Sequence, residues 1–384
     1  MSTIKVNKIE NTSTTDGGIS IDNSGNVQMS GNVQISGQQM PSAGPLSNRN
    51  LIINGAMRVA QRATSKASIT TQAYHTVDRF NLNINALGTW TMSQESSGPD
   101  GFANSLKLLC TTADASPAAA DVAIIIYRVE GQDLQQLAYG SSAAKQSTLS
   151  FYVKSNKTGN ATVNLKQPNA SNRIYSAQYT ISSADTWERK TIVVPADTSG
   201  TINDDFGNGL QIEWPLNTGS DYTGGSHGGW KAADDTSRNN SNLGVGGAVN
   251  DYYEITGVQL EVGSVATPFE HRSFGDEIAK CKRYFQKSYS YGNAVGANTA
   301  DGRYYFLLGA ENTARNKGGS VYLGTEMRVA PTTNFYNDAG TQGVIQLPAS
   351  SVTPLLLKTH VIAIYVGNTT AVEIAGAWTA EAEL

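Results

Sequence analysis

Aromatic residues are absent from the first part of the sequence: no Phe, Tyr or Trp precedes Tyr74. The stretch GNVQMSGNVQISG, residues 25–37, repeats the unit G-N-V-Q-(Met/Ile)-S, so that apolar residues alternate with polar ones. Such alternation predicts short strands with turns at Ser-Gly. Strands with two apolar residues each cannot offset the loss of about 1–2 kcal/mol of backbone entropy per residue. We therefore expect residues 1–49 either to be disordered or to intertwine with identical chains, and the regular alternation favours intertwining.

Charged residues are also scarce, at 16% of the sequence, against about 25% in an ordinary domain. The chain has 28 Lys and Arg against 32 Asp and Glu, which provides no basic excess for tracking phosphates, so we expect no nucleic-acid partner. No apolar run approaches the roughly 20 residues of a membrane-spanning helix. The first residues, MSTIKVNKIENTS, lack the apolar core of a secretory signal. We expect no membrane insertion, and synthesis in a reducing cytoplasm.

Cysteine and histidine are too few and too scattered to predict a metal or redox site. Cys110 and Cys281 fit no ligand spacing, so buried free thiols are expected, with a disulfide as the alternative. The sequence contains no G-x-S-x-G, Walker or H-E-x-x-H motif. Adjacent acidic residues at 204–205 and 234–235 lie in polar stretches, whereas glycosidases need two carboxylates across a cleft. We therefore expect no enzymatic activity, no cofactor and no metal, although the oxygens of residues 203–209 leave calcium as an alternative.

From about residue 50 the sequence is rich in strand signals. Runs of β-branched and aromatic residues recur every 8–15 residues between Gly, Asn, Asp and Pro. They include SLKLLCTT, DVAIIIYRVEG, STLSFYVKS, ATVNLKQ, RIYSAQYTIS, TWERKTIVVPA, GLQIEWPL and DYYEITGVQLEVG. Many alternate between polar and apolar residues, which is typical of strands with one buried face. About eight antiparallel strands predict a jelly-roll β-sandwich over residues 50–272.

One segment, SFGDEIAKCKRYFQK, has helical periodicity. Ser273 precedes Asp276 by three residues, as in a capping box, and apolar residues up to Phe285 fall on one helical face. We predict a linker helix over residues 273–288. Strand signals resume after it and predict a smaller C-terminal β-domain over residues 289–384. The predicted fold class is therefore all-β: an intertwined N-terminal segment, a jelly-roll sandwich, one short helix and a second β-domain.

The loop between Asn217 and Asn250 is the best candidate for a binding site. It is long, rich in Gly, Asn and Ser, and carries Tyr222 and Trp230. Loops longer than about 12–15 residues are usually functional or disordered. Both aromatic rings could stack on sugar rings, while Asn and Asp side chains bind hydroxyl groups. The alternative is that Trp230 packs against its own sheet or a neighbouring subunit.

Three segments resemble a module of tailed-bacteriophage tail fibre proteins. They are IIYRVEGQDLQQLAYGSSAAKQSTLSFYVKSNKTG (125–159), TWERKTIVVPADTSGT (186–201) and ITGVQLEVGSVATPFEHRSFGDEIAKCKRYFQKSY (255–289). In that family, the phrase QLEVG…ATPFE closes a jelly roll that resembles carbohydrate-binding modules, and a short helix with a Cys-x-Arg/Lys-Tyr-Phe/Tyr pattern follows. The stretch NLIINGAMRVAQR (50–62) is similar to the start of the family's domain.

The resemblance implies a structural protein of the virion, made in the host cytoplasm. It would be a homotrimeric tail fibre that recognises host-surface polysaccharide without catalysis, with residues 1–49 docked on a tail or capsid protein. Two alternatives stay open: a capsid-bound decoration protein or head fibre, and a polysaccharide-degrading tailspike. No ligand contact of the family transfers by motif, so the site at Tyr222 and Trp230 rests on the composition of its loop.

Overall fold

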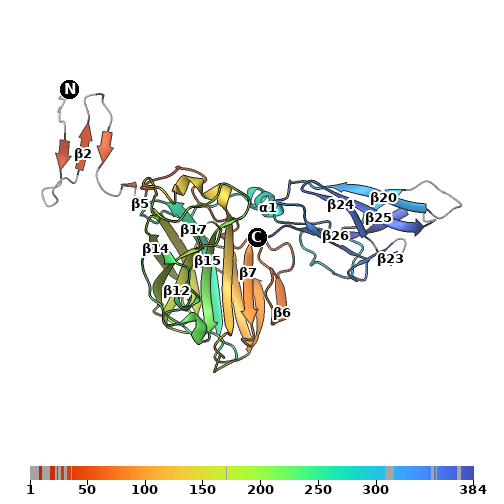
Figure 1. The fold of residues 1–384 in the computed structure, drawn as a ribbon, viewed down its shortest axis with the longest axis horizontal. Helices are drawn as coiled ribbons and strands as arrows, with labels where there is room; N and C mark the ends of the chain where they lie inside the picture. The colour runs from red at the N-terminus through yellow and green to blue at the C-terminus, as the bar shows by residue number, and fades with distance from the viewer. Residues whose placement is uncertain are drawn as a thin grey trace.

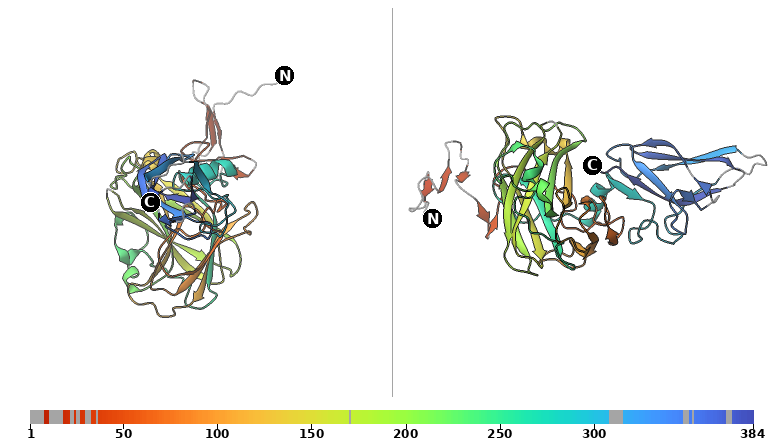
Figure 2. Two further views of the ribbon diagram at one scale, coloured as in Figure 1. Left: turned by 90° about the vertical axis from the view of Figure 1, so that its right-hand side faces the viewer. Right: turned by 60° about the horizontal axis from the view of Figure 1, so that its bottom comes forward.

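A computed structural model describes residues 8–10, 18–21, 24, 27–29, 33–35, 37–169, 171–307, 315–346, 350–351, 353–369 and 373–384. Strands dominate, and a β-sandwich forms the middle of the molecule (Figure 1). The three strands β1–β3 lie off one end of the sandwich, and a second group of sheets lies at the other (Figures 1 and 2). The predicted all-β jelly-roll fold is confirmed. Among the described helices, none combines the length and apolarity needed to cross a membrane.

The sandwich consists of two six-stranded antiparallel sheets. The β15 sheet has the order β16 (Lys231–Ala232), β13 (Arg173–Ile181), β12 (Gly159–Gln167), β15 (Asn208–Thr218), β10 (Val122–Glu130) and β7 (Phe80–Asn85). The β17 sheet has the order β14 (Glu188–Val194), β11 (Ser147–Ser155), β17 (Tyr252–Val262), β9 (Ser105–Thr112), β8 (Thr89–Glu95) and β6 (Ser65–Ile69). All eight runs predicted as strands are present, and β6, β7, β8 and β16 are additional to them.

The space between the two sheets holds the main hydrophobic core. Along β10, Ala123, Ile125 and Tyr127 point into this core, whereas Ile124 and Ile126 belong to a separate cluster on the other face. This is the period-two alternation of a strand in a sandwich. Trp90 and Trp214 are completely buried in the same core. Each buried apolar side chain of this size contributes roughly 1.5–3 kcal/mol or more, so the core accounts for the order of the sandwich.

The helix α1 spans Phe274–Lys282 and begins as predicted, because Ser273 Oγ accepts a hydrogen bond from Asp276 N at 3.1 Å. It ends at Lys282, six residues before the end of the range 273–288 predicted as helical. The residues that follow form strand β18 (Phe285–Lys287), which pairs with Thr379–Glu381. Phe285 is therefore buried beside a strand almost 100 residues away, a partner that local periodicity does not reveal.

The C-terminal sheets surround strand β26 (Glu373–Glu381), which pairs with β18, with β19 (Tyr304–Leu307) and with β21 (Thr332–Tyr336). A second sheet has the order β20 (Arg315–Tyr322), β25 (Val361–Thr369) and β24 (Thr353–Lys358), and β22 (Val344–Ile345) pairs with β23 (Ser350–Ser351). Their small core includes Met327, Phe335, Ile362 and Trp378.

The N-terminal residues 1–49 are here called the leader, and the strands among its described residues form two small units. Strands β1 (Lys8–Glu10), β2 (Gly18–Ile21) and β3 (Val27–Met29) pair antiparallel, and β4 (Gln34–Ile35) pairs with β5 (Gln38–Gln39). Val27–Met29 and Gln34–Ile35 of the hexads form strands, as predicted, whereas Val33 lies just outside β4; residues 25–26, 30–32 and 36 of the repeats lie outside the described residues. Ile19, Ile21 and Val27 are 38%, 45% and 55% exposed, so these apolar side chains lack a sufficient core within one chain.

A cluster of buried charges joins the sandwich to the C-terminal sheets. Arg79 has no exposed surface, is paired with Glu383, and donates a hydrogen bond to Arg128 O at 2.7 Å. Arg62 lies 3.3 Å from the Glu383 carboxylate and 3.9 Å from Asp78. Burial raises the pKa of Asp78 to about 6, although Arg62 acts in the opposite direction. Removing one partner of such a buried pair leaves the other charge buried without a counter-charge, which lowers the free energy of unfolding.

The raised pKa of Asp78 predicts a pH dependence of stability. Its folded pKa lies above the ordinary 3.8, so its contribution to the free energy of unfolding is fully present below about pH 4 and is lost as the pH rises through about 6. Asp78→Asn should remove this part of the pH dependence in urea unfolding between pH 4 and 7. The exposed Asp235→Asn is the control and should keep the wild-type profile. Identical profiles for Asp78→Asn and wild type would contradict the assignment.

Candidate functional site

Trp230, one of the two predicted site residues, is half-buried against its own sandwich. Its ring centroid lies 5.7 Å from that of Tyr139 and 5.8 Å from that of Tyr175. Its indole Nε1 donates a hydrogen bond to Pro195 O at 2.8 Å. These contacts correspond to the alternative in which Trp230 packs on its own sheet. Glycan stacking by this residue stays a prediction.

Tyr222, the other predicted site residue, lies in the 3-10 turn η2 (Ser220–Tyr222) and has different partners. Its ring packs on the outer face of the β15 sheet, against Val122, Ile124 and Ile126. The Arg238 guanidinium lies 5.3 Å from the ring centroid and forms two 2.9 Å hydrogen bonds with the buried Glu213 carboxylate. The described contacts therefore do not bring Tyr222 and Trp230 into one site.

The loop that carries both residues is fastened onto the β15 sheet. The two ring nitrogens of His227 lie 3.2 Å from Ser176 Oγ and 3.0 Å from Ser241 Oγ. Asn164 Nδ2 donates to Arg238 O at 2.6 Å. Polar side chains of the loop are thus used to hold it in place, and the loop covers much of the outer face of this sheet.

The outer face of the β17 sheet, by contrast, carries a pocket of about 390 Å³. Its floor holds four ring side chains: Phe102, Tyr152, Phe269 and His271. Phe102 is central, with its ring centroid 5.3 Å from Tyr152, 5.0 Å from Phe269 and 5.2 Å from His271. A concave site with aromatic lining and a few polar groups is the usual form of a small-ligand site.

A glycine in the middle of β17 makes room for this aromatic floor. The pairing of β11 with β17 shifts between Ser150 and Tyr152, which is the register change of a β-bulge. Gly257 lies in this irregularity with φ of 62°. A Cβ atom at this position would lie 2.8 Å from Phe102 Cζ and 2.9 Å from Tyr152 Cδ2. A side chain at 257 would therefore both strain the backbone and displace the rings.

Polar groups of opposite charge lie beside the rings. Asp100 and Arg189 both line the pocket and are exposed, and the buried Ser150 also lines it. Arg189 Nη2 donates a hydrogen bond to Thr267 O at 2.6 Å, which holds the guanidinium at the pocket edge. One carboxylate and one guanidinium balance in charge, so the pocket suits a neutral ligand that both donates and accepts hydrogen bonds.

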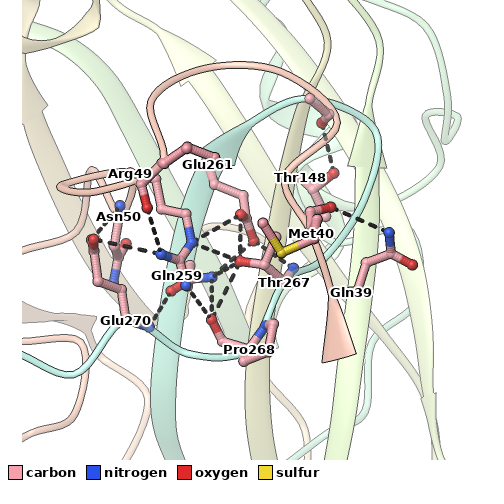
Figure 3. Close-up of polar contacts among 12 residues, drawn as sticks. Gln39, Met40, Arg49, Asn50, Thr148, Gln259, Glu261, Thr267, Pro268 and Glu270 are labelled. Atoms are coloured by element: carbon pink, nitrogen blue, oxygen red, sulfur yellow. Dashed lines mark hydrogen bonds and ion pairs between the residues drawn. The ribbon is translucent and has the colours of Figure 1, made fainter. Parts of the chain in front are cut away.

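The wall formed by residues 266–271 is held by Arg49 (Figure 3). Arg49 Nε donates to Thr267 Oγ1 and Nη2 donates to Pro268 O, each at 2.8 Å. Its guanidinium also lies 3.7 Å from each of the carboxylates of Glu261 and Glu270. Burial alone would raise the pKa of Glu270, but the hydrogen bond from Asn50 N and nearby Arg272 hold that pKa below its ordinary value.

No metal site is apparent among the residues that the structure describes: they contain no group of three or more His, Cys, Asp or Glu side chains that could hold an ion. In the loop weighed for calcium, the Asp205 carboxylate accepts hydrogen bonds from Asn169 Nδ2 and Gly207 N. Cys110 and Cys281 are free and buried, which confirms the expectation of unpaired thiols.

Sequence reasoning missed the pocket because its residues come from separate segments of the chain, from Gly37 to His271. Two local signals were available. Gly257 interrupts a strand pattern, which often marks a bulge or a close approach. The second signal is the spacing of Phe269 and His271, two residues apart in the sequence; in the structure their rings lie 4.8 Å apart. Neither signal identifies Tyr152 or Arg189 as their neighbours.

The chain matches no protein-family model and no curated protein. Solved structures that it is similar to include the enzymatically active domain of tailspike protein 4 of bacteriophage CBA120 (TM-score 0.30, 11% identity, 56% of this chain and 21% of that chain). Another is a family 11 carbohydrate-binding module from Clostridium thermocellum in complex with a β-1,3-1,4-mixed-linked tetrasaccharide (TM-score 0.27, 12% identity, 54% of this chain and 99% of that chain). The chain thus spans about a fifth of the tailspike structure. Likenesses of this degree carry no argument about function.

Replacement of Gly257 tests how the floor is built. Gly257→Ala should lower the free energy of unfolding by about 1–3 kcal/mol, because it adds a Cβ against two rings at positive φ. Urea denaturation measures the change. Gly292→Ala is the matched control, since a Cβ there meets nothing within 4 Å, and it should change stability by less than about 0.5 kcal/mol. Equal effects of the two substitutions would show that the bulge is not constrained by the rings.

Proposed function

We propose that this protein is a structural protein of a bacteriophage virion, a homotrimeric fibre that recognises neutral glycans of the host surface without catalysis. The observation that carries the proposal is the aromatic pocket on the β17 sheet, with Asp100 and Arg189 beside its rings. The sequence resemblance to tail fibre modules supports the virion role. The site is placed at the pocket rather than at Tyr222 and Trp230, whose rings pack on the protein's own surface.

Sugar chemistry matches the pocket. A pyranose ring has an apolar face of C–H groups, which packs on an aromatic ring, and an edge of hydroxyl groups that donate and accept hydrogen bonds. The rings of Phe102 and Tyr152 supply the first kind of surface, and the side chains of Asp100 and Arg189 supply acceptors and donors. Among the described residues that line the pocket, Asp100 carries the single carboxylate, whereas glycoside hydrolysis uses a pair. Binding without cleavage is therefore the activity that the pocket favours.

The leader supports self-assembly. The register of β1–β3 places Ile9 beside Ile19 and Ile19 beside Met29, with Val27 beside Ile21. The exposed isoleucines and valine of this small sheet need a cover, and identical chains around an axis provide one. A closed assembly also leaves no free strand edge for further association. Three linked copies of a weak glycan site raise avidity by about 10²–10⁴.

The partner of the leader on the particle is a tail protein in the proposed fibre. In the alternative, a capsid protein takes its place and the molecule is a head fibre or decoration protein. Cryo-electron microscopy of the intact virion distinguishes the two, because it locates the chain directly on the tail or on the shell.

Loss of one of the pocket's rings should weaken glycan binding. On an array of host-surface polysaccharides and neutral oligosaccharides, the full-length protein should bind, and Tyr152→Ala should weaken binding by about tenfold or more, since about 1.4 kcal/mol of stacking energy corresponds to a factor of ten. Trp230→Ala is the informative comparison, because Trp230 is equally aromatic but lies outside the pocket. Circular dichroism checks that both variants are folded.

The outcomes of this comparison separate the two candidate sites. Binding that survives Tyr152→Ala and is lost in Trp230→Ala would move the site to the loop at Asn217–Asn250. Indifference of the wild-type protein to every surface polysaccharide and neutral oligosaccharide would overturn glycan recognition itself.

Disruption of the leader's apolar face should dissociate the assembly. The double variant Ile19→Ser, Ile21→Ser removes two side chains per chain, each worth about 1.5–3 kcal/mol when buried. Sedimentation equilibrium should report a trimer for the wild type and a monomer for the variant. Val193→Ser is the control: Val193 is a comparably exposed valine (41%) on the sandwich, and its loss should leave the trimer intact. A monomeric wild-type chain would contradict the proposed assembly.

A further inference from the structure

We infer that the leader hairpin β4–β5 is a wall of the glycan pocket, so that ligand binding and docking of the leader on the sandwich stabilise each other. The inference rests on the proposed function for the class of ligand, a neutral glycan. It adds a link between the pocket and the part of the chain that assembles and attaches. The pocket is then a composite site, incomplete without the leader.

The hairpin contributes to the pocket directly. Gly37, Gln38 and Gln39 line it, opposite residues that belong to the sandwich. Gln39 Nε2 donates to Val33 O at 3.0 Å, and Met40 N donates to the same oxygen at 2.8 Å, so these groups maintain the hairpin. Gln38 is exposed at the pocket. Its amide provides one acceptor and two donor hydrogens for the hydroxyl groups of a bound sugar.

The segment after the hairpin is attached to the end of β17. Ser42 Oγ accepts a hydrogen bond from Ser264 N at 3.0 Å. Gly44 approaches so closely that a Cβ would lie 3.0 Å from Val262 Cβ, and a Cβ at Gly263 would lie 2.5 Å from Ser42 Oγ. These contacts place the leader's last residues directly on the strand end that leads into the opposite wall of the pocket.

The opposite wall is held by the same part of the chain. Arg49 bonds to Thr267 Oγ1 and Pro268 O, and Thr267 Oγ1 donates to the buried Glu261 carboxylate at 2.7 Å (Figure 3). Arg189 bonds to Thr267 O from the pocket side. One continuous set of contacts, centred on Thr267, therefore links the hairpin, the residues that follow it and the wall at 266–271.

The hairpin itself is small enough for a ligand to affect its position. Its strands have two residues each, and an isolated two-stranded hairpin is marginally stable at best. Ile35 is 59% exposed, and a Cβ at Gly37 would meet no atom within 4 Å. A sugar held between Gln38 and the aromatic floor adds contacts that exist only when the hairpin is docked.

Linkage makes this effect reciprocal. If ligand binding raises the equilibrium constant for docking of the hairpin by some factor, then docking of the hairpin raises the affinity for the ligand by the same factor. Assembly of the leader with other chains restricts the hairpin in this way and so pre-organises the pocket. Recognition of the host glycan is in turn transmitted to the segment that holds the fibre on the particle.

The experiment uses the full-length protein and three neutral probes, maltohexaose, cellohexaose and β-1,4-galactohexaose, together with whichever polysaccharide binds best on the array. Isothermal titration should show that Gln38→Ala weakens binding by about three- to tenfold, the effect of one lost hydrogen bond. Gln342→Ala is the control: it is the same substitution at an exposed glutamine of the C-terminal domain, outside the hairpin and the pocket lining, and it should bind as the wild type does.

Hydrogen exchange provides the reciprocal measurement. Saturating probe should slow amide exchange over residues 38–45 in the wild type at least threefold, and by less in Gln38→Ala; the exchanging amides are those of residues 38–40 and 42–44, because Pro41 and Pro45 have none. Tyr152→Ala, which lacks one ring of the floor and binds more weakly, should show less slowing at these residues than the wild type at the same probe concentration. Residues on the far side of the sandwich, such as Asn164, serve as the internal reference and should exchange at the same rate with and without probe.

Each outcome is decisive. Binding that is weakened by Gln38→Ala and accompanied by slower exchange at residues 38–45 supports the composite site. Binding that requires Tyr152 but is unaffected by Gln38→Ala, with unchanged exchange in the leader, overturns the link and leaves the proposed function in place. Absence of binding by any probe or polysaccharide overturns both.

Discussion

The Arg49 guanidinium lies where three parts of the molecule meet: the end of the leader, strand β17, and the turn at Thr267 and Pro268 that follows it. An arginine can serve all three because its planar group donates in several fixed directions at once. Glu261 and Glu270 balance its charge at 3.7 Å each. Without these contacts, the turn would lose a partner for two oxygen atoms, and among the described residues the leader would keep only its contacts through Ser42 and Gly44. Arg49 therefore contributes both to the wall of the pocket and to the attachment of the leader.

The two outer faces of the sandwich illustrate how similar sheets serve different purposes. The β15 sheet is covered by its own loop, which uses Tyr222, the Arg238–Glu213 pair and the His227 ring to stay in place. The β17 sheet carries a bulge at Gly257 instead, and the relief of side-chain bulk there leaves a hollow above the rings. A covered face contributes stability, whereas a hollow face with opposed charges is suited to recognition. In the proposed function, the architecture therefore assigns stability to one layer and recognition to the other.

Much of the fold follows from short-range pattern, and the exceptions have a common cause. Strand β14 was predictable because one face is buried, which imposes alternation on its sequence, and β10 was predictable as a run of β-branched and aromatic residues that is buried on both faces. The end of α1 was not, since β18 forms only through pairing with β26 at Phe285 and Glu381. The same holds for the predicted binding site: Trp230 lies in a loop whose composition suits sugar binding, yet its ring packs on Tyr139, which is far away in the sequence. Composition indicates which side chains could bind, and tertiary contacts decide which are available.

Strand β26 has a consequence for the order of events during synthesis. It pairs with β18, β19 and β21, all of which precede it, with Phe285 and Glu381 as one register pair. A ribosome therefore releases three strands with open edges long before their common partner appears. Until residues 373–381 have left the exit tunnel, these edges can pair with those of neighbouring nascent chains. The C-terminal sheet can therefore fold correctly only after β26 has been synthesised.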